Sequence, residues 1–397
     1  MELRLDDPAL YSDISAGELM RSYLNLQLLA FDPVVSMASR ALSPKTSILL
    51  RGPMLWAVRY VTFPYFCAGE NLTDASHTLS HLWHHLRLQG ILNFALEDAF
   101  DETFCDSSLL SFLDAIRQIN KLPTGSVSFA CIKITAICPV PLLERVSNLL
   151  RFQHIHPSFN LPWQEKDLPV FAHESPMYCL QNQPEPLSPE EEKIFAKAKE
   201  RLWQLCKESR NVGVPLLVDA EYASVQPAID YLTYAAAVAF NDHSEGGTVV
   251  YGTMQAYLKD SFPREQALAA FLKIPSPVHK CIEDTHKCYN SSAVFLLEKA
   301  AAGWGRVVLA THNVESGRIA AAKALELGLT NRDSRLQFGQ LKGMADSLSL
   351  SLVRAGFKVS KYLAYGPLEH LVPYLLRRAE ENKGVVNNTA VDRRCIR

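Results

Sequence analysis

The chain has 397 residues, of which 48% are apolar and 21% charged, a composition typical of a globular protein with a sizeable core. Its formal net charge of −2 excludes the strongly basic field expected of a nucleic-acid-binding protein. The nine cysteines are odd in number and none forms a C-x-x-C pair. We therefore expect reduced thiols in an intracellular compartment, with neither a disulfide framework nor a structural zinc site.

The first residues, MELRLDDPALYSD, are acidic and lack an apolar stretch. They predict neither a secretory signal peptide nor an Arg-rich mitochondrial presequence. The chain contains no uninterrupted run of about 18 apolar residues, so we expect no membrane-spanning helix, and any membrane association would be peripheral.

Residues 1–88 are expected to form an N-terminal helical region. Ser15 followed by Glu18 is the spacing of a capping box, with helical apolar periodicity behind it. Farther on, His81, His84 and His85 raise the question of a metal site, because residues four apart are neighbours on a helix. No acidic or cysteine companion lies nearby in the sequence, so we predict no metal.

Apolar, β-branched segments then alternate with helical stretches such as 189–208 and 316–328. The predicted strands are 90–98, 126–138, 214–222, 247–257, 305–313, 335–344 and 357–366. This alternation is typical of a parallel sheet buried on both faces, and it favours an α/β fold of the (β/α)8 TIM-barrel type, distorted here. We assign residues 89–386 to this barrel, with a Pro-rich and aromatic insert near 151–190, and 387–397 to a short tail.

A closed barrel of this type needs eight strands, and the sequence predicts one fewer. Residues 258–303 contain helical material and a Pro275-Ser276-Pro277 break but no β-branched run. One βα unit is therefore expected to be missing, or the barrel closes in an unusual way.

Polar residues follow several predicted strands. Lys133, Asp219, Gln255 and the run Thr311-His312-Asn313 all occupy such positions. In a (β/α)8 barrel these ends form the active-site rim, so the side chains would converge. Two plainer interpretations stay open at this point: Asp219 as a loop organiser, and Asn313 as the N-cap of the following helix.

The final predicted helix, LEHLVPYLLRRAEEN, carries Arg377 and Arg378 side by side. They could cover a solvated helix face, or they could form a fork that captures a carboxylate between Tyr374 and Glu381. The chain has no G-x-G-x-x-G, no P-loop and no G-x-S-x-G motif, so neither a Rossmann site, a P-loop nucleotide site nor a serine hydrolase is supported.

Six segments together resemble the proline dehydrogenase (proline oxidase) family, most closely its plant-type mitochondrial members. They are SFACIKITAICP, LLVDAEYASVQPAIDYL, QAYLKD, LATHNVESGR, FGQLKGMADSLS and SKYLAYGPLEHLVPYLLRRAEEN, and the similarity runs from about residue 60 to 386. The resemblance implies a flavoenzyme that oxidises L-proline to Δ1-pyrroline-5-carboxylate. It also implies FAD as cofactor, transfer of electrons to a quinone or other respiratory-chain acceptor, and peripheral association with the mitochondrial inner membrane.

The resemblance also implies roles for individual residues. Arg377 and Arg378 match the arginines that bind the proline carboxylate, with Lys133 assisting and Glu381 paired behind them. Tyr362, Leu341 and Tyr374 match the wall of the pyrrolidine ring, and Asp219 lies on the substrate side. The flavin-side positions implied are Gln255, Thr311, His312, Asn313 and Gln337, with Thr285 matching an adenylate contact.

One departure from the family pattern bears on function. Between Asp260 and Ser276 the family has a further strand with a K-L-V-R-G-A-Y-type motif, which supplies flavin contacts and is absent here. We expect weak or absent flavin retention as a result, and the chain reads as a shortened isoform or as a gene model with a skipped exon. The alternative function is a catalytically impaired family member that acts as a non-enzymatic binding protein. A different flavin barrel, such as a folate reductase, is a third reading.

Overall fold

The structure is a computed structural model. It describes residues 3, 5, 7–29, 32–42, 48–164, 168–171, 182–241, 247–258, 279, 281–329 and 333–384. The chain divides into two compact units, each assembled from separate stretches of sequence. Unit 1 comprises Met1–Ala95, Lys121–Ser128 and Ala293–Arg397, and unit 2 comprises Leu96–Asn120 and Phe129–Ser292.

The N-terminal part of unit 1 is helical, as the sequence predicts. Its helices are α1 (Ala16–Leu29), α2 (Asp32–Leu42), α3 (Ile48–Tyr60), the short α4 (Phe63–Phe66) and α5 (Leu72–Leu86). The predicted capping box is present before α1: the Glu18 N–H donates to Ser15 Oγ at 3.3 Å, and the Ser15 N–H donates to Glu18 Oε2 at 3.1 Å. A three-residue strand, β1 (Cys67–Gly69), interrupts this region and was not expected.

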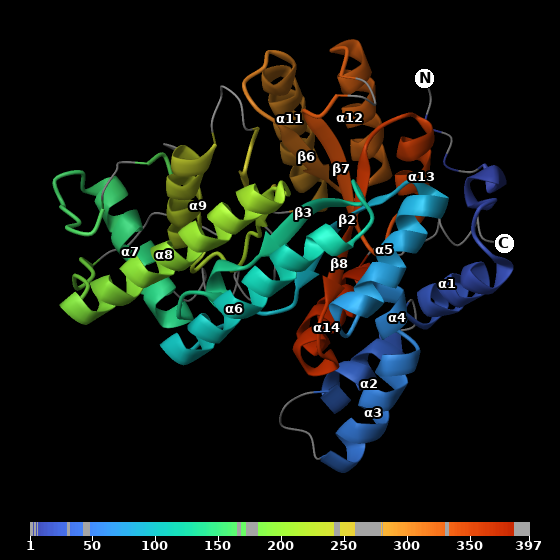
Figure 1. Cartoon of the computed structure of the whole chain (residues 1–397), viewed down its shortest axis with the longest axis horizontal. Helices are drawn as coiled ribbons and strands as arrows, with labels where there is room; N and C mark the ends of the chain where they lie inside the picture. The colour runs from blue at the N-terminus through green and yellow to red at the C-terminus, as the bar shows by residue number, and fades with distance from the viewer. Residues whose placement is uncertain are drawn as a thin grey trace. The chain divides into compact units, whose positions relative to one another are not determined.

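The sheet of unit 1 is parallel (Figure 1). Strand β8 (Val359–Tyr365) lies between β2 (Gln89–Phe94) and β7 (Leu336–Leu341), and β7 pairs in turn with β6 (Val307–Ala310). The end of β8 also pairs with β1. The helices that follow β6, β7 and β8 are α12 (Val314–Glu326), α13 (Asp346–Arg354) and α14 (Leu368–Gly384), and α11 (Ile282–Ala301) precedes β6.

Unit 2 repeats the strand–helix alternation. Strands β3 (Val127–Ile132), β4 (Leu216–Val218) and β5 (Val250–Gly252) pair in parallel in that order. Its helices are α6 (Glu102–Gln118), α7 (Val140–Ile155), α8 (Pro189–Val212) and α9 (Gln226–Phe240). Helix α8 begins with a complete capping box formed by Ser188 and Glu191, and it ends at Gly213, whose φ of 75° only glycine adopts readily.

All seven strands predicted from the sequence are present, and the α/β class is confirmed. The structure assigns shorter strands than the apolar segments suggest, because the polar residues at the end of each segment belong to loops. Residues 151–155, placed in the insert, instead complete α7. The missing eighth strand was predicted between residues 260 and 276. That range and the tail 387–397 lie outside the described residues. The domain boundaries at 88 and 386 stay a prediction.

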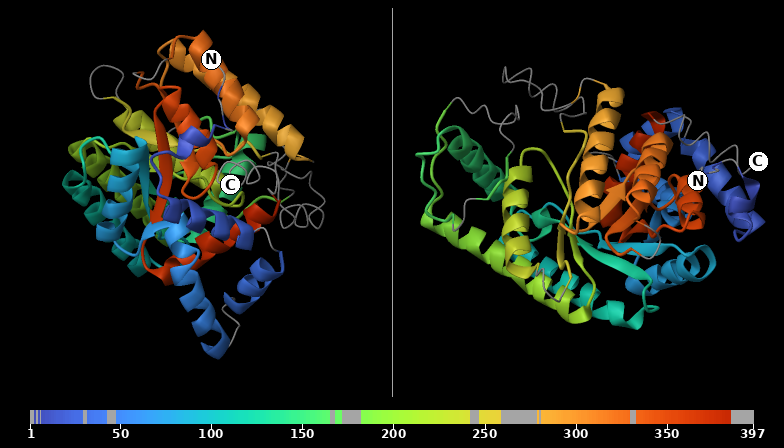
Figure 2. Two further views of the ribbon diagram at one scale, coloured as in Figure 1. Left: turned by 90° about the vertical axis from the view of Figure 1, so that its right-hand side faces the viewer. Right: turned by 90° about the horizontal axis from the view of Figure 1, so that it is seen from above.

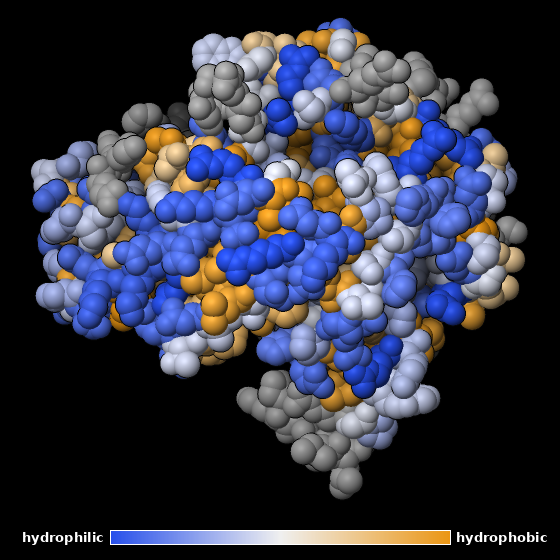
Figure 3. All heavy atoms as spheres, viewed as in Figure 1, coloured by the Kyte–Doolittle hydropathy of each residue, from blue (hydrophilic) through white to orange (hydrophobic). Residues whose placement is uncertain are grey.

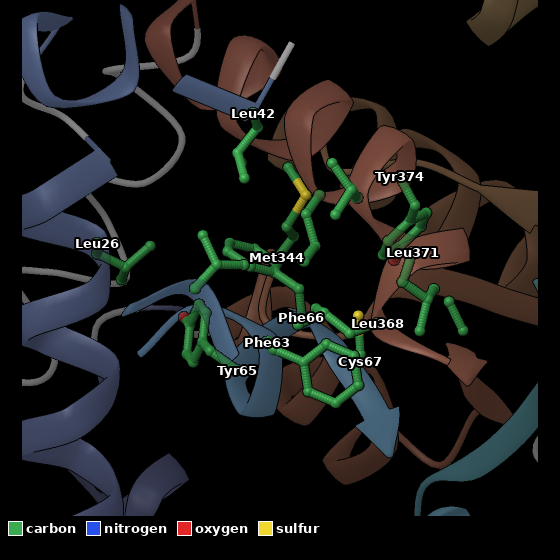
Figure 4. Close-up of a cluster of buried hydrophobic side chains, with 14 residues drawn as sticks. Leu26, Leu42, Phe63, Tyr65, Phe66, Cys67, Met344, Leu368, Leu371 and Tyr374 are labelled. Atoms are coloured by element: carbon green, nitrogen blue, oxygen red, sulfur yellow. The ribbon is translucent and has the colours of Figure 1, made fainter. Parts of the chain in front are cut away.

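The hydrophobic core of unit 1 joins its helices to its sheet (Figure 4). Leu26 of α1, Phe66 of α4, Met344 after β7 and Leu371 of α14 are members of one buried cluster. Phe66 is 1% exposed and Leu371 fully buried, so truncating either to alanine removes about 2–5 kcal/mol of stability. This packing fixes the position of α14 within unit 1.

Helices α6 and α8 lie side by side in unit 2 (Figures 1 and 2), and the face that they present in Figure 3 is mostly hydrophilic. Beneath this face Arg201, which is 3% exposed, donates to Glu102, to Asp106 and to the Ile137 carbonyl. A guanidinium can be buried there because its donors meet two carboxylates and a carbonyl. Within the part of the chain that the structure describes, no helix combines the length and apolar character needed to cross a bilayer.

Candidate active site

Helix α14 carries the arginine pair within unit 1. Adjacent helical residues point about 100° apart, and the two arginines accordingly have different surroundings. Arg378 is buried, at 9% exposed, whereas Arg377 is partly exposed. An arginine on a solvated helix face would not be buried to this extent, so the solvated-face interpretation does not hold for Arg378, and the carboxylate fork stays a prediction.

Two neighbours on the same helix hold Arg378. Its Nη2 donates to Glu381 Oε1 at 2.6 Å, and its Cζ lies 5.1 Å from the centroid of the Tyr374 ring. The spacing follows from the helix: Tyr374 is one turn before Arg378, and Glu381 is three residues after it. The ion pair with Glu381 and the contact with the Tyr374 ring restrict the guanidinium to a narrow range of orientations. A preformed anion site requires such a restriction.

The three residues predicted to wall a substrate ring share one hydrophobic cluster. Tyr374 is among its buried members, and Leu341 at the end of β7 and Tyr362 in β8 pack against it. The Tyr374 hydroxyl is buried and meets no hydrogen-bond partner among the described residues. Burial is the largest influence on that hydroxyl and raises its pKa well above the ordinary value, so it remains protonated.

His312 follows β6, and it lies close enough to Arg378 for the charge of the guanidinium to act on it. The Leu341 N–H donates to its Nε2 at 3.1 Å, so in the neutral ring the proton resides on Nδ1. Burial, followed by the positive charges of Arg378 and Lys361, lowers the pKa of His312 to about 3. The imidazole is therefore neutral at physiological pH, and it links β6 to the end of β7.

The residues on either side of His312 form a local cap. The Asn313 side chain accepts from the Ser316 N–H at 2.8 Å as the N-cap of α12, and the Asn313 N–H donates to Thr311 Oγ1 at 3.0 Å. The plainer interpretation of Asn313 is thus correct as to its local structure. The flavin-side roles of Thr311 and Asn313 remain predictions.

Gln337 lies apart from these residues, at the amino end of β7. Its Nε2 donates to Gln89 Oε1 at 3.2 Å and to the Ser360 hydroxyl. Ser360 Oγ is also 2.8 Å from Ser128 Oγ. These contacts link strands of the sheet near their amino ends, whereas Leu341 and His312 mark the carboxyl ends. The structure therefore does not place Gln337 with the other predicted residues of unit 1.

Unit 2 carries the second group of predicted residues. Lys133, directly after β3, donates from Nζ to Asp219 Oδ2 at 2.9 Å, and Glu97 Oε2 lies 3.8 Å away. Cys131 Sγ donates to the other oxygen of Asp219 at 3.1 Å. Burial alone would lower the pKa of Lys133, but the negative charges of Asp219, Glu221 and Glu97 outweigh burial and raise it, so the amine stays protonated.

Gln255 and Thr285, also in unit 2, each present a buried oxygen. Gln255 donates from Nε2 to the Glu221 carbonyl at 3.3 Å and to Tyr257 Oη at 2.6 Å. Its Oε1 and the Thr285 hydroxyl have no hydrogen-bond partner among the residues for which coordinates are described. A buried acceptor left unsatisfied is costly unless a ligand completes it.

Sequence reasoning missed two lysines of unit 1, of which Lys361 is buried and Lys342 is partly exposed. Lys361 is 2% exposed; it pairs with Asp346 Oδ1 at 2.6 Å and donates to the Met344 carbonyl at 2.8 Å. Lys342 donates to the Pro64 and Tyr65 carbonyls at 2.7 and 2.8 Å. Lys361 lies inside the predicted strand 357–366 and Lys342 near the end of 335–344, and only the packing reveals their partners. Within the described ranges no group of three metal-binding side chains occurs.

Comparison with known proteins shows which family of sequences the chain resembles. The sequence profile of the family described as "Proline dehydrogenase" matches residues 85–273 and 262–391. Proline dehydrogenases 1 and 2 of Arabidopsis thaliana, both named mitochondrial, are 40% identical to the chain; the alignments cover 99% and 100% of it and 84% and 90% of the relatives. Human hydroxyproline dehydrogenase is 30% identical, over 93% of the chain and 87% of its own length.

Solved structures support the same fold. Proline utilization A from Bdellovibrio bacteriovorus matches with a TM-score of 0.62 at 17% identity, covering 92% of this chain and 37% of that protein. A Bradyrhizobium japonicum homologue matches with a TM-score of 0.54. The chain thus spans about a third of these larger proteins, and the likeness supports the expected (β/α)8-type α/β fold. By its sequence profile and its full-length relatives, the chain belongs to the proline dehydrogenase family of oxidoreductases.

Proposed function

We propose that the chain catalyses the FAD-dependent oxidation of L-proline to Δ1-pyrroline-5-carboxylate and passes the electrons to a quinone. The observation that supports this most directly is the arrangement around Arg378. A buried guanidinium is held by Glu381 and lies over Tyr374, beside the cluster to which Leu341 and Tyr362 belong. Such a site combines a carboxylate receptor with an apolar wall, as a small cyclic amino acid requires.

Substrate binding follows from this arrangement. Arg378, and Arg377 beside it on α14, would hold the carboxylate, and a guanidinium can donate two parallel bonds to it. The side chains of Leu341, Tyr362 and Tyr374 would contact the ring carbons. Because the carboxylate fixes one end of the substrate and the wall fixes the ring, the carbon beside nitrogen is held in a single orientation.

The oxidation removes a hydride from the ring carbon next to nitrogen as a C=N bond forms, and the amine must be neutral for this. Two features of unit 1 favour a neutral amine. The positive charge of Arg378 opposes a second cation nearby, and His312 is uncharged. When bound, FAD supplies the hydride acceptor.

The residues expected on the flavin side fit such a cofactor. Gln255 has a buried Oε1 that can accept from an N–H group, and Thr285 has a buried hydroxyl without a described partner. His312 keeps its Nδ1–H as a donor because Nε2 accepts from Leu341. Lys133 and Asp219 are paired at 2.9 Å within unit 2, and a role on the substrate side is proposed for them from the family resemblance alone.

Hydroxyproline is the nearest competing substrate, because four of the relatives aligned over most of the chain are named hydroxyproline dehydrogenase. We favour proline because Tyr362 is a bulky member of the apolar wall, and its ring occupies space that a ring hydroxyl would need. The mitochondrial names of the plant relatives support a mitochondrial location, and peripheral association with the inner membrane is proposed from the family resemblance alone.

Purification and spectroscopy test the proposal. Supplied with FAD, the protein should bind a yellow flavin chromophore, even if it retains it only weakly, that is bleached by L-proline under anaerobic conditions and reoxidised by a soluble quinone. A folded protein that neither carries nor accepts FAD contradicts the enzyme assignment and supports the alternative, a non-enzymatic binding protein. Flavin reduction by NADH but not by proline would point to a different flavin barrel.

A further inference from the structure

The carboxylate of Glu221 joins two loops of unit 2 that carry predicted site residues. It accepts from the Thr135 N–H at 3.1 Å through Oε1 and from the Thr135 hydroxyl through Oε2. Thr135 is fully buried and lies two residues after Lys133, whereas Glu221 lies two residues after Asp219. The contact between Glu221 and Thr135 therefore holds together two loops, the one after β3 and the one after β4. The first residues of these loops are Lys133 and Asp219, which pair with each other.

A third loop is tied to the same threonine. The Asp98 N–H donates to Thr135 Oγ1 at 3.1 Å, and the Ala99 N–H donates to the Thr135 carbonyl at 2.7 Å. This loop follows β2 and carries Glu97, the second carboxylate near Lys133. Tyr222 strengthens the connection, since its hydroxyl donates to Asp98 Oδ2 at 3.1 Å.

The backbone of Glu221 is held as firmly as its side chain. Its N–H donates to Gln226 Oε1 at 2.8 Å, and its carbonyl accepts from Gln255 Nε2 at 3.3 Å. Two residues on, Arg151 donates to the Ala223 carbonyl at 2.6 Å. Glu221 thus lies at the centre of a polar network in which every loop bearing Glu97, Lys133, Asp219 or Gln255 takes part.

We propose that Glu221 is a positioning residue of the active site, which acts through Thr135 to hold the Lys133–Asp219 pair in its working geometry. This inference rests on the proposed function, because it is for proline oxidation that the pair is assumed to matter. A network of this kind locks the side chains that touch substrate without itself touching it.

The charge state of Glu221 gives the network a measurable signature. Burial raises the pKa of its carboxyl to about 7, although Lys133 and the bonds from Thr135 act in the opposite direction. Two charged groups, Lys133 and Asp219, act on Glu221 directly. Three further carboxyl groups share a partner with it: Glu97 lies near Lys133, the loop of Asp98 bonds to Thr135, and Asp230 accepts from Gln226. When Glu221 takes up a proton, one carboxyl oxygen becomes a donor, so it no longer accepts from Thr135 as before.

The first test measures Lys133 itself and does not depend on activity. In competitive labelling of amines followed by mass spectrometry, Lys133 should react slowly in the wild type, because nearby carboxylates keep it protonated. Glu221→Gln removes one of these carboxylates and should increase Lys133 labelling several-fold at the same pH. Lys197, which pairs with Glu102 at 3.1 Å, is the internal reference. Labelling of Lys197 should be the same in the wild type and in Glu221→Gln, and Glu102→Gln should leave the labelling of Lys133 unchanged.

The second test measures proline oxidation as a function of pH. The wild-type kcat/KM should show an inflection near the Glu221 pKa of about 7, and Glu221→Gln should lose it. Thr135→Val should lower kcat/KM about tenfold by loosening the loops, whereas Thr135→Ser, which keeps the hydroxyl, should restore it. Thr233→Val is the matched control, because the Thr233 hydroxyl is also buried but donates to the Ile229 carbonyl within α9.

The outcomes separate the two proposals. A wild type that binds flavin but does not oxidise proline overturns the proposed function, while the labelling still decides whether Glu221 controls Lys133. With an active wild type, unchanged Lys133 labelling in Glu221→Gln, or an unchanged pH profile, overturns the positioning role. Equal losses in Thr135→Val, Thr135→Ser and Thr233→Val would show a general effect on folding and would also overturn it.

Discussion

The guanidinium of Arg378 lies over the ring of Tyr374, with Cζ 5.1 Å from the ring centroid. Both side chains are buried and belong to successive turns of one helix, and Glu381 completes the arrangement from the next turn. An arginine held on two sides loses little further freedom when it binds an anion, which is the main advantage of a preorganised receptor.

Replacing this arginine should therefore weaken substrate binding. Arg378→Lys keeps the charge but loses the planar fork, and we expect a loss of about 1–3 kcal/mol, or about 10- to 100-fold in kcat/KM for proline. Steady-state kinetics measure the effect, with Arg117→Lys on the exposed face of α6 as the control. An unchanged KM and kcat in Arg378→Lys would contradict the carboxylate fork.

Tyr362 should control the choice between proline and its hydroxylated analogue. Tyr362→Ser opens space in the apolar wall, so oxidation of 4-hydroxyproline should become measurable while kcat/KM for proline falls about tenfold. Tyr362→Phe keeps the bulk of the ring and should retain the preference for proline. The ratio of kcat/KM for the two substrates is the quantity to compare, and a ratio that is the same in all three proteins would show that Tyr362 does not set specificity.

His312 should make the folded state sensitive to acid. Its pKa is about 3 in the folded protein and near the ordinary value of 6.5 in the unfolded chain. The unfolded state therefore binds the proton first, so this contribution to stability is complete above pH 6.5 and is lost as the pH falls toward 3. His312→Gln, which can still accept from the Leu341 N–H, should flatten this part of the pH dependence in chemical denaturation. An identical pH slope in the two proteins would argue against a buried neutral histidine.

Lys342 should make the free energy of unfolding depend on pH in the alkaline range. Burial, together with the charges of Lys361 and Arg21, lowers its pKa from 10.5 to about 8, against the opposing influence of Cys67 and Asp346. Between these values the unfolded chain holds more protons, so stability should rise with pH from about 8 to 10.5. Lys342→Met should lose this rise. The free energy of unfolding, measured across that range for both proteins, decides the point.

Arg201 tests the stability of unit 2 separately from the site. Arg201→Met leaves the Ile137 carbonyl without its buried donor, while the carboxylates of Glu102 and Asp106, 27% and 65% exposed, can be hydrated; we expect a cost of about 1–3 kcal/mol of unfolding free energy. The exposed pair of Arg117 with Glu208 provides the contrast, and Arg117→Met should cost no more than about 1 kcal/mol. Denaturant midpoints distinguish the two, and equal costs would mean that the burial of Arg201 has little energetic consequence.

Much of the fold could be predicted from local signals. The seven strands, the capping boxes before α1 and α8, and the helix that carries Arg377 and Arg378 all follow from periodicity and cap residues, which act over a few positions. Strand β1 was missed because three residues, Cys67–Gly69, are too few to show a period. Gln337 illustrates a different difficulty: the predicted strand 335–344 already put it near the amino end, so its flavin-side role rested on the family resemblance alone.

The sequence alone determined the family, the parallel α/β class and the residue types available for chemistry, because these depend on composition, periodicity and long motifs. Tertiary structure decided which of those residues are buried and which meet. Arg378 became distinguishable from Arg377 only through the packing of α14, and Glu221 emerged as the centre of a network only when three loops came together around Thr135. Contacts between residues far apart in the chain, and the burial that shifts a pKa, depend on how elements pack, and no local pattern in the sequence encodes them.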